Sequence, residues 1–138
     1  MVTVINADMN IVGRLSTFVA KRLLQGEEIA IVNAQNALIS GSRDAIVREY
    51  KARFVRGSQR KGPFYPKMPD RILRRAVRGM LPYQTPRGKK AYQNLRVFIG
   101  IPSKYTGEAQ EVIEKAKKPG LHRCVKLGDL SNVLGAKF

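Results

Sequence analysis

The segment VTVINADMNIVGRLSTFVAKRLLQGEEIAIVN, residues 2–33, decides the fold. Its two ends, 2–6 and 29–33, are short apolar runs rich in β-branched residues, as is typical of strands. Between them, residues 13–25 carry apolar side chains at helical spacing, and Gly26 follows as a C-terminal cap. Because the second run is continuously apolar, we expect its strand to be covered on both faces. The segment therefore predicts a parallel strand–helix–strand unit.

The rest of the chain continues this alternation. Apolar runs predict further strands at 37–40 and 95–101, and helical periodicity or spaced charges predict helices at 43–56, 70–80, 89–94 and 108–118. Residues 81–88 are expected to form a turn, and the short tail to Phe138 is only weakly patterned. Ser42 is expected to cap the helix after it, with Asp44 in the first turn. The pattern predicts one α/β domain with a mainly parallel sheet, spanning residues 1–138.

Positive charge is concentrated in the middle of the chain. The net charge is +16, from 26 Lys and Arg against 10 Asp and Glu. Residues 1–42 are balanced, whereas residues 43–96 hold sixteen basic side chains and three acidic ones. A face kept only for solubility normally mixes the two signs. The imbalance indicates a polyanionic partner, and nucleic acid is the leading class.

A loop rich in proline and glycine lies inside this basic segment. GSQRKGPFYPKMP, residues 57–69, excludes regular structure, and long ordered loops are usually functional. Phe64 and Tyr65 lie in it among basic residues. They can stack on unpaired bases, or they can tuck under the loop as local core, and the sequence favours neither alternative.

The predicted nucleic-acid surface is made of the helix at 43–56, this loop and the helix at 70–80. Guanidinium groups bind phosphate with two parallel hydrogen bonds, and Lys adds point charges. The candidate residues for RNA binding are Arg48, Lys51, Arg53, Arg56, Arg60, Lys61, Phe64, Tyr65, Lys67, Arg71, Arg74, Arg75, Arg78, Arg87, Lys89 and Lys90.

The sequence gives little support for nucleotide binding, zinc binding or catalysis. Residues 7–13 contain one glycine where a dinucleotide fingerprint needs three, and no phosphate-binding G-x-x-x-x-G-K-[ST] run occurs. His122 and Cys124, each the only one of its kind, cannot form a zinc site alone, and their spacing does not make them face each other. The single cysteine excludes an internal disulfide. We expect no catalytic residue, metal or cofactor, no membrane or signal segment, and a cytoplasmic location.

Several segments resemble the universal large-subunit ribosomal protein family numbered thirteen. They are VGRLSTFVAKRLLQGE at 12–27, IVNAQNALISG at 31–41, GPFYPKMPDRILRRAVRGMLP at 62–82 and LRVFIGIP at 95–102. The Gly-Pro-aromatic start of the loop, the Gly-Ile-Pro after the last strand and the short C-terminus resemble archaeal members. Asn6, where the family often has Asp, and Ala136, where a tryptophan is common, depart from the pattern. The second departure weakens any transfer of C-terminal contacts.

The resemblance implies a three-layer α/β/α domain with a four-stranded parallel sheet in the order 3-2-1-4. It also implies binding and bracing of large-subunit ribosomal RNA beside neighbouring ribosomal proteins, without catalysis or a small-molecule substrate. Two rival hypotheses remain. A nucleotide-dependent or RNA-modifying enzyme would be stabilised by nucleotide in thermal melts. A chromatin-type protein would prefer duplex DNA to structured RNA at fixed salt.

Overall fold

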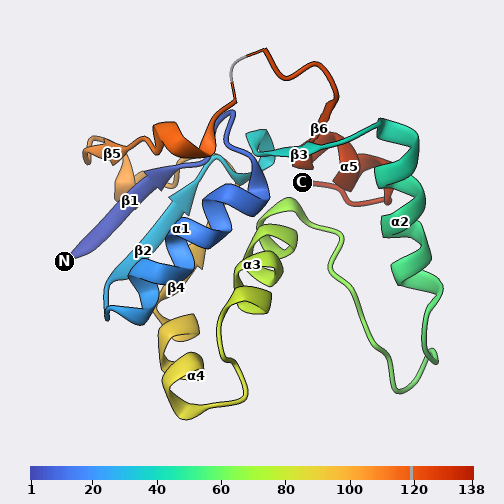
Figure 1. Cartoon of the computed structure of the whole chain (residues 1–138), viewed down its shortest axis with the longest axis horizontal. Coiled ribbons are helices and arrows are strands. Elements are labelled where there is room, and N and C mark those ends of the chain that lie inside the picture. Colours follow the sequence, from blue (N-terminus) through green and yellow to red (C-terminus); the bar gives the residue numbers. More distant parts are fainter. Residues whose placement is uncertain (119) are drawn as a thin grey trace.

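The computed structural model describes residues 1–118 and 120–138 (Figure 1). Its central sheet contains β1 (Val2–Asn6), β2 (Glu28–Val32), β4 (Leu95–Val97) and β5 (Gln110–Glu111), all parallel, in the order β4-β2-β1-β5. Numbered along the chain within this sheet, the order is 3-2-1-4. The predicted α/β class and strand order are therefore confirmed.

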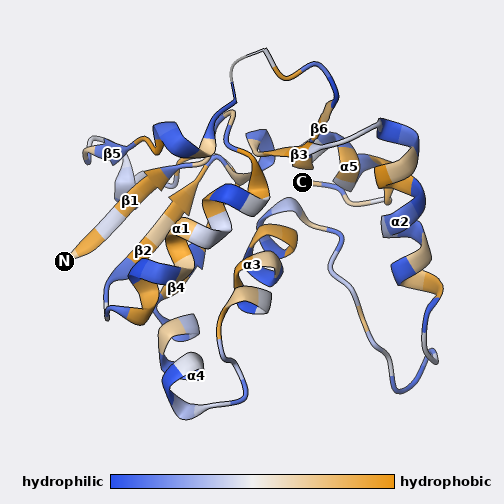
Figure 2. Ribbon diagram, in the orientation of Figure 1, coloured by the Kyte–Doolittle hydropathy of each residue, from blue (hydrophilic) through white to orange (hydrophobic). Residues whose placement is uncertain are grey.

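Helices cover one face of the sheet. The helices α1 (Val12–Leu24), α3 (Pro69–Met80) and α4 (Pro86–Gln93) enclose the main core with Ile5, Ile29, Ile31 and Leu95 of the strands. In Figure 2 hydrophobic and hydrophilic residues alternate along α1, and the buried ones include Leu15, Val19 and Leu23. The other face is covered by the segment after β4, in which Tyr105 of the 3-10 helix η2 (Ser103–Tyr105) is 1% exposed and packs with Val4, Ala30 and Val32. Both faces of β2 are thus buried, as its apolar run predicted.

A smaller unit stands beside the sheet. After the 3-10 helix η1 (Ala34–Asn36), β3 (Leu38–Ser40) pairs antiparallel with β6 (Cys124–Lys126), and α2 (Arg43–Val55) and α5 (Leu127–Val133) pack around this pair. The strand predicted at 37–40 exists, but the expectation that it extends the parallel sheet is wrong. Its partner comes from the C-terminal tail, about 85 residues away in sequence, a pairing that no local pattern signals.

The predicted helix at 108–118 is wrong. This segment supplies the edge strand β5 and one 3-10 turn, η3 (Glu114–Ala116). Ile113 is buried against the core, and Glu111 pairs with Arg22 instead of Lys115. Helical ion pairs contribute only about 0.2–0.5 kcal/mol each, so burial of an isoleucine and strand pairing outweigh them.

Other boundaries shift by a few residues. The strand predicted at 95–101 ends at Val97. Three residues later the chain turns at Gly100, which has a φ of +70°. The helix predicted at 89–94 begins earlier, at Pro86, where the Thr85 hydroxyl accepts a hydrogen bond from the Gly88 amide. The predicted cap of α2 is confirmed, since the Ser42 hydroxyl accepts from the Ala45 amide at 3.4 Å. No helix in the described ranges combines the length and apolar character needed to cross a membrane.

Candidate nucleic-acid interface

Helix α3 is built to present arginines. Ile72, Leu73 and Val77 are at most 5% exposed and fix one side of the helix in the core. The opposite side therefore faces outward along its whole length. The arginines on it are Arg71, Arg74, Arg75 and Arg78, and the helix connects directly to the basic loop.

The ring of Tyr65 lies between two guanidinium groups. The guanidinium carbon of Arg75 is 4.7 Å from the ring centroid, and that of Arg53 on α2 is 5.8 Å from it. Arg75 also donates a hydrogen bond from Nη1 to the Phe64 carbonyl at 3.1 Å. These contacts join α2, the loop and α3; Figure 1 shows the loop, in green, running from the end of α2 to the start of α3.

A second set of stacked pairs joins α3 to α4 and to the turn that precedes α4. The Arg74 guanidinium lies 4.6 Å from the Tyr92 ring centroid, and that of Arg78 lies 4.7 Å from the Tyr83 ring. The two tyrosines meet edge to face, with centroids 5.4 Å apart. Cation–π contacts of this kind orient the guanidinium planes and leave their N–H edges available.

We call these residues the arginine–aromatic face: Arg53, Phe64, Tyr65, Arg71, Arg74, Arg75, Arg78, Tyr83 and Tyr92. Between the loop and α3 the face contains an open hollow of about 480 Å³, the α3 hollow. It is lined by Phe64, Tyr65, Pro66, Tyr92 and the four arginines of α3.

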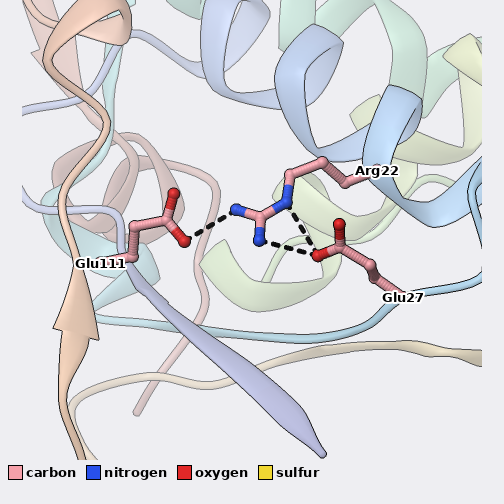
Figure 3. A network of polar contacts seen from close by, with 3 residues as sticks. All are labelled: Arg22, Glu27 and Glu111. Carbon is pink, nitrogen blue, oxygen red and sulfur yellow. Dashed lines mark hydrogen bonds and ion pairs between the residues drawn. The ribbon is translucent and has the colours of Figure 1, made fainter.

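Carboxylates do not neutralise the α3 arginines. Within the described ranges, none of these four has a carboxylate oxygen within 4.0 Å. Arg22 in α1 shows the contrast: its guanidinium binds Glu27 at 2.7 Å and Glu111 at 2.8 Å, tying the edge strand β5 to α1 (Figure 3). The hydrogen bonds that Arg22 donates to these two carboxylates raise its pKa. On the arginine–aromatic face, Arg53 alone has such a partner among residues 1–118 and 120–138, and this partner is Glu49.

Phe64 and Tyr65, the two aromatic residues of the loop, differ in how far they are buried. Tyr65 is half-buried between arginines, which agrees with the local-core alternative, whereas Phe64 is 64% exposed, which agrees with a ring available for stacking. Neither placement was decided by the sequence.

The other predicted site residues make few contacts with the arginine–aromatic face. Lys67 lies over the Phe54 ring at 5.3 Å, near the face. The remaining candidates are exposed on α2, the loop and α4, and none has an ion pair or ring contact within the described part of the chain: Arg48, Lys51, Arg56, Arg60, Lys61, Arg87, Lys89 and Lys90.

Sequence reasoning missed the tyrosines that hold the arginines. Tyr83 and Tyr92 meet α3 only through the fold, so no local signal identified them. The Tyr50–Arg53 contact, 4.6 Å from guanidinium carbon to ring centroid, has helical i to i+3 spacing and could have been found. Burial raises the pKa of Tyr50. Arg96 was also missed, and it lines a neighbouring hollow with Arg71 and Arg74.

The lone histidine and cysteine form no assembled site in the structure. His122 is exposed, and the half-buried thiol of Cys124 donates to the Leu121 carbonyl at 4.0 Å. Among the residues described, no three His, Cys, Asp or Glu side chains gather as metal ligands.

Comparison with known proteins identifies the family to which the chain belongs. The family model described as "Ribosomal protein L13" matches residues 1–104. The chain belongs to this family. It is 45% identical to the large ribosomal subunit protein uL13 of Methanosphaera stadtmanae, over 100% of both chains. The uL13 protein of Methanococcoides burtonii is 47% identical, over 99% of each chain, and that of Natronomonas pharaonis is 48% identical, over 96% of this chain and 90% of the relative.

These findings confirm the resemblance to family thirteen and its archaeal character. The L13 family is one of ribosomal structural proteins, which is not an enzyme class. Its matched region contains the whole arginine–aromatic face, whereas β6 and α5 lie beyond it.

Proposed function

We propose that this chain is a structural constituent of the large ribosomal subunit that binds and braces large-subunit ribosomal RNA. The proposal places it in cytoplasmic ribosomes beside other large-subunit proteins and gives it no catalytic role, cofactor or small-molecule substrate. Membership in the L13 family and full-length similarity to uL13 proteins support the ribosomal part.

One observation carries the RNA-binding part. Aromatic rings hold Arg74, Arg75 and Arg78 of α3, and a backbone carbonyl also holds Arg75, whereas none of the four α3 arginines has a carboxylate partner among the described residues. Pairing them with acidic side chains would have cancelled their charge. Phosphate binds guanidinium edges with two hydrogen bonds, and phosphate contacts supply most of the affinity for nucleic acid. The face therefore fits the RNA backbone.

A competition experiment tests the proposal. The full chain is bound to deproteinised large-subunit ribosomal RNA at fixed salt, and duplex DNA or polyglutamate is added as competitor. We expect unlabelled ribosomal RNA to displace the bound RNA at far lower concentration than either competitor. Equal displacement by duplex DNA would favour a general DNA-binding protein, and displacement by polyglutamate would favour an acidic protein partner. Either result would overturn the proposal.

A further inference from the structure

The α3 hollow has features that backbone binding alone does not require. Its volume of about 480 Å³ lies within the roughly 300–1,000 Å³ of typical ligand pockets. One part of its wall is the exposed ring of Phe64, and another is the row of α3 arginines. An aromatic plane and several guanidinium groups therefore line the same hollow. The inference that follows rests on the proposed function and specifies which part of an RNA this hollow takes.

The arginines of the hollow have unused donors. Arg71, Arg74 and Arg78 make no side-chain hydrogen bond within the described ranges, and Arg75 donates only to the Phe64 carbonyl. The Nε atom of Arg74 is buried and unpartnered, although a guanidinium carries five N–H donors. The guanidinium groups of Arg71 and Arg78 line the open hollow, where a ligand can reach their N–H groups. A phosphate group supplies the acceptors that these donors lack.

Phe64 is fixed in an exposed position. Pro63 directly precedes Phe64 and Pro66 follows Tyr65, so both prolines restrict the loop backbone, and Arg75 donates a hydrogen bond to the Phe64 carbonyl at 3.1 Å. The loop is thereby tied to α3 while the ring remains 64% exposed. A large apolar ring held in water beside phosphate donors is a platform for a nucleobase.

We propose that the α3 hollow receives one unpaired nucleotide of RNA, with its base stacked on Phe64 and its phosphate at the edges of Arg71 and Arg78. Regular duplex RNA keeps its base faces stacked inside the helix, so it cannot fill the aromatic part of the hollow. An acidic peptide satisfies the arginines but brings no flat base. An unpaired nucleotide meets both requirements at once.

Two RNA hairpins provide the probes. One has a single unpaired residue, 2-aminopurine, in its stem, and the other has the same stem without it. The fluorescence of 2-aminopurine changes when the base leaves its stacked neighbours in the stem. We expect the full chain to bind the bulged hairpin about tenfold more tightly and to change its fluorescence, since one base–aromatic stack corresponds to a factor of this order. Phe64→Ala should lose the preference and the fluorescence change, and Phe64→Trp should keep the preference. Arg78→Gln should weaken binding to both hairpins.

The outcomes separate this inference from the proposed function. Salt-dependent binding with no preference for the bulged hairpin would overturn the inference and leave RNA binding intact. A preference unchanged in Phe64→Ala would overturn it as well. Failure of both hairpins and of ribosomal RNA to bind would contradict the proposed function itself. Because Phe64 is exposed, its variants should melt at the wild-type temperature, which is checked first.

Discussion

At the scale of single residues, close packing explains positions that carry no function. Gly88 lies in the first turn of α4, close to the backbone of Pro82. A Cβ added to it would lie 1.9 Å from the Pro82 carbonyl oxygen. That contact is with backbone, which cannot move aside as a flexible side chain can. The position therefore requires glycine for space and not for conformation.

We accordingly expect Gly88→Ala to lower the free energy of unfolding by about 1–3 kcal/mol, the usual cost of overpacking. Gly13 in α1 is the matched control, since a Cβ there meets nothing within 4 Å. Gly13→Ala should leave stability unchanged or raise it by up to about 1 kcal/mol. Urea denaturation measures both variants. Equal destabilisation by the two substitutions would contradict the role given to Pro82.

Tyr50 gives a prediction for pH. Burial raises its pKa above the ordinary value of 10.0, although Arg53 opposes the shift. The folded state then holds the phenolic proton more tightly than the unfolded state. The protonated Tyr50 therefore contributes to the free energy of unfolding fully below about pH 10, and this contribution is lost as the pH rises further. Between about pH 8 and about pH 11, the stability of Tyr50→Phe should fall less than that of the wild type. If the free energies of unfolding of the wild type and Tyr50→Phe fall equally with pH, burial of Tyr50 has no such effect.

At the scale of elements, residue propensity and hydrophobic patterning predicted the helices and strands that are determined by their own local sequence. The strands β1 and β2 follow from their apolar runs, α2 from its cap and α3 from its amphipathic period. The errors fall where distant segments decide the structure. The strand β5 is stabilised by pairing with β1 and by the ion pair of Arg22 with Glu111, neither of which local sequence reveals.

The C-terminal tail shows the same limit. Its pattern is too weak and too short to predict a helix, yet Leu127 and Leu130 of α5 are fully buried in the main core. The tail is therefore a structural part of the domain.

Leu130→Ala should lower the free energy of unfolding by about 2–5 kcal/mol, because it removes buried methyl groups and leaves a cavity. Val133→Ala on the same helix is the control. Val133 is 36% exposed, so we expect a change near 0.5 kcal/mol or less. Thermal melts of both proteins give the comparison. A Leu130→Ala protein as stable as the control would mean that α5 does not share the core.

At the scale of the whole molecule, the basic surplus lies in the segments that surround the central sheet. The balanced N-terminal segment forms the centre of the sheet and α1, while α2, the loop, α3 and α4 carry the basic surplus. The sequence predicted which segments make the candidate site. It could not predict that tyrosines from α4 and the preceding turn would hold the arginines, because those contacts exist only after folding.

The most direct test of the central claim is the salt dependence of binding to large-subunit ribosomal RNA. In the full chain, Arg74, Arg75 and Arg78 are replaced together by Gln, and a control carries Gln at the exposed Lys115, Lys118 and Lys137. The slope of log affinity against log salt should become about two to three units shallower in the arginine variant, the value for three phosphate contacts, and should stay near wild type in the control. An equal slope in the wild type and the arginine variant would contradict the assignment of RNA binding to the arginine–aromatic face.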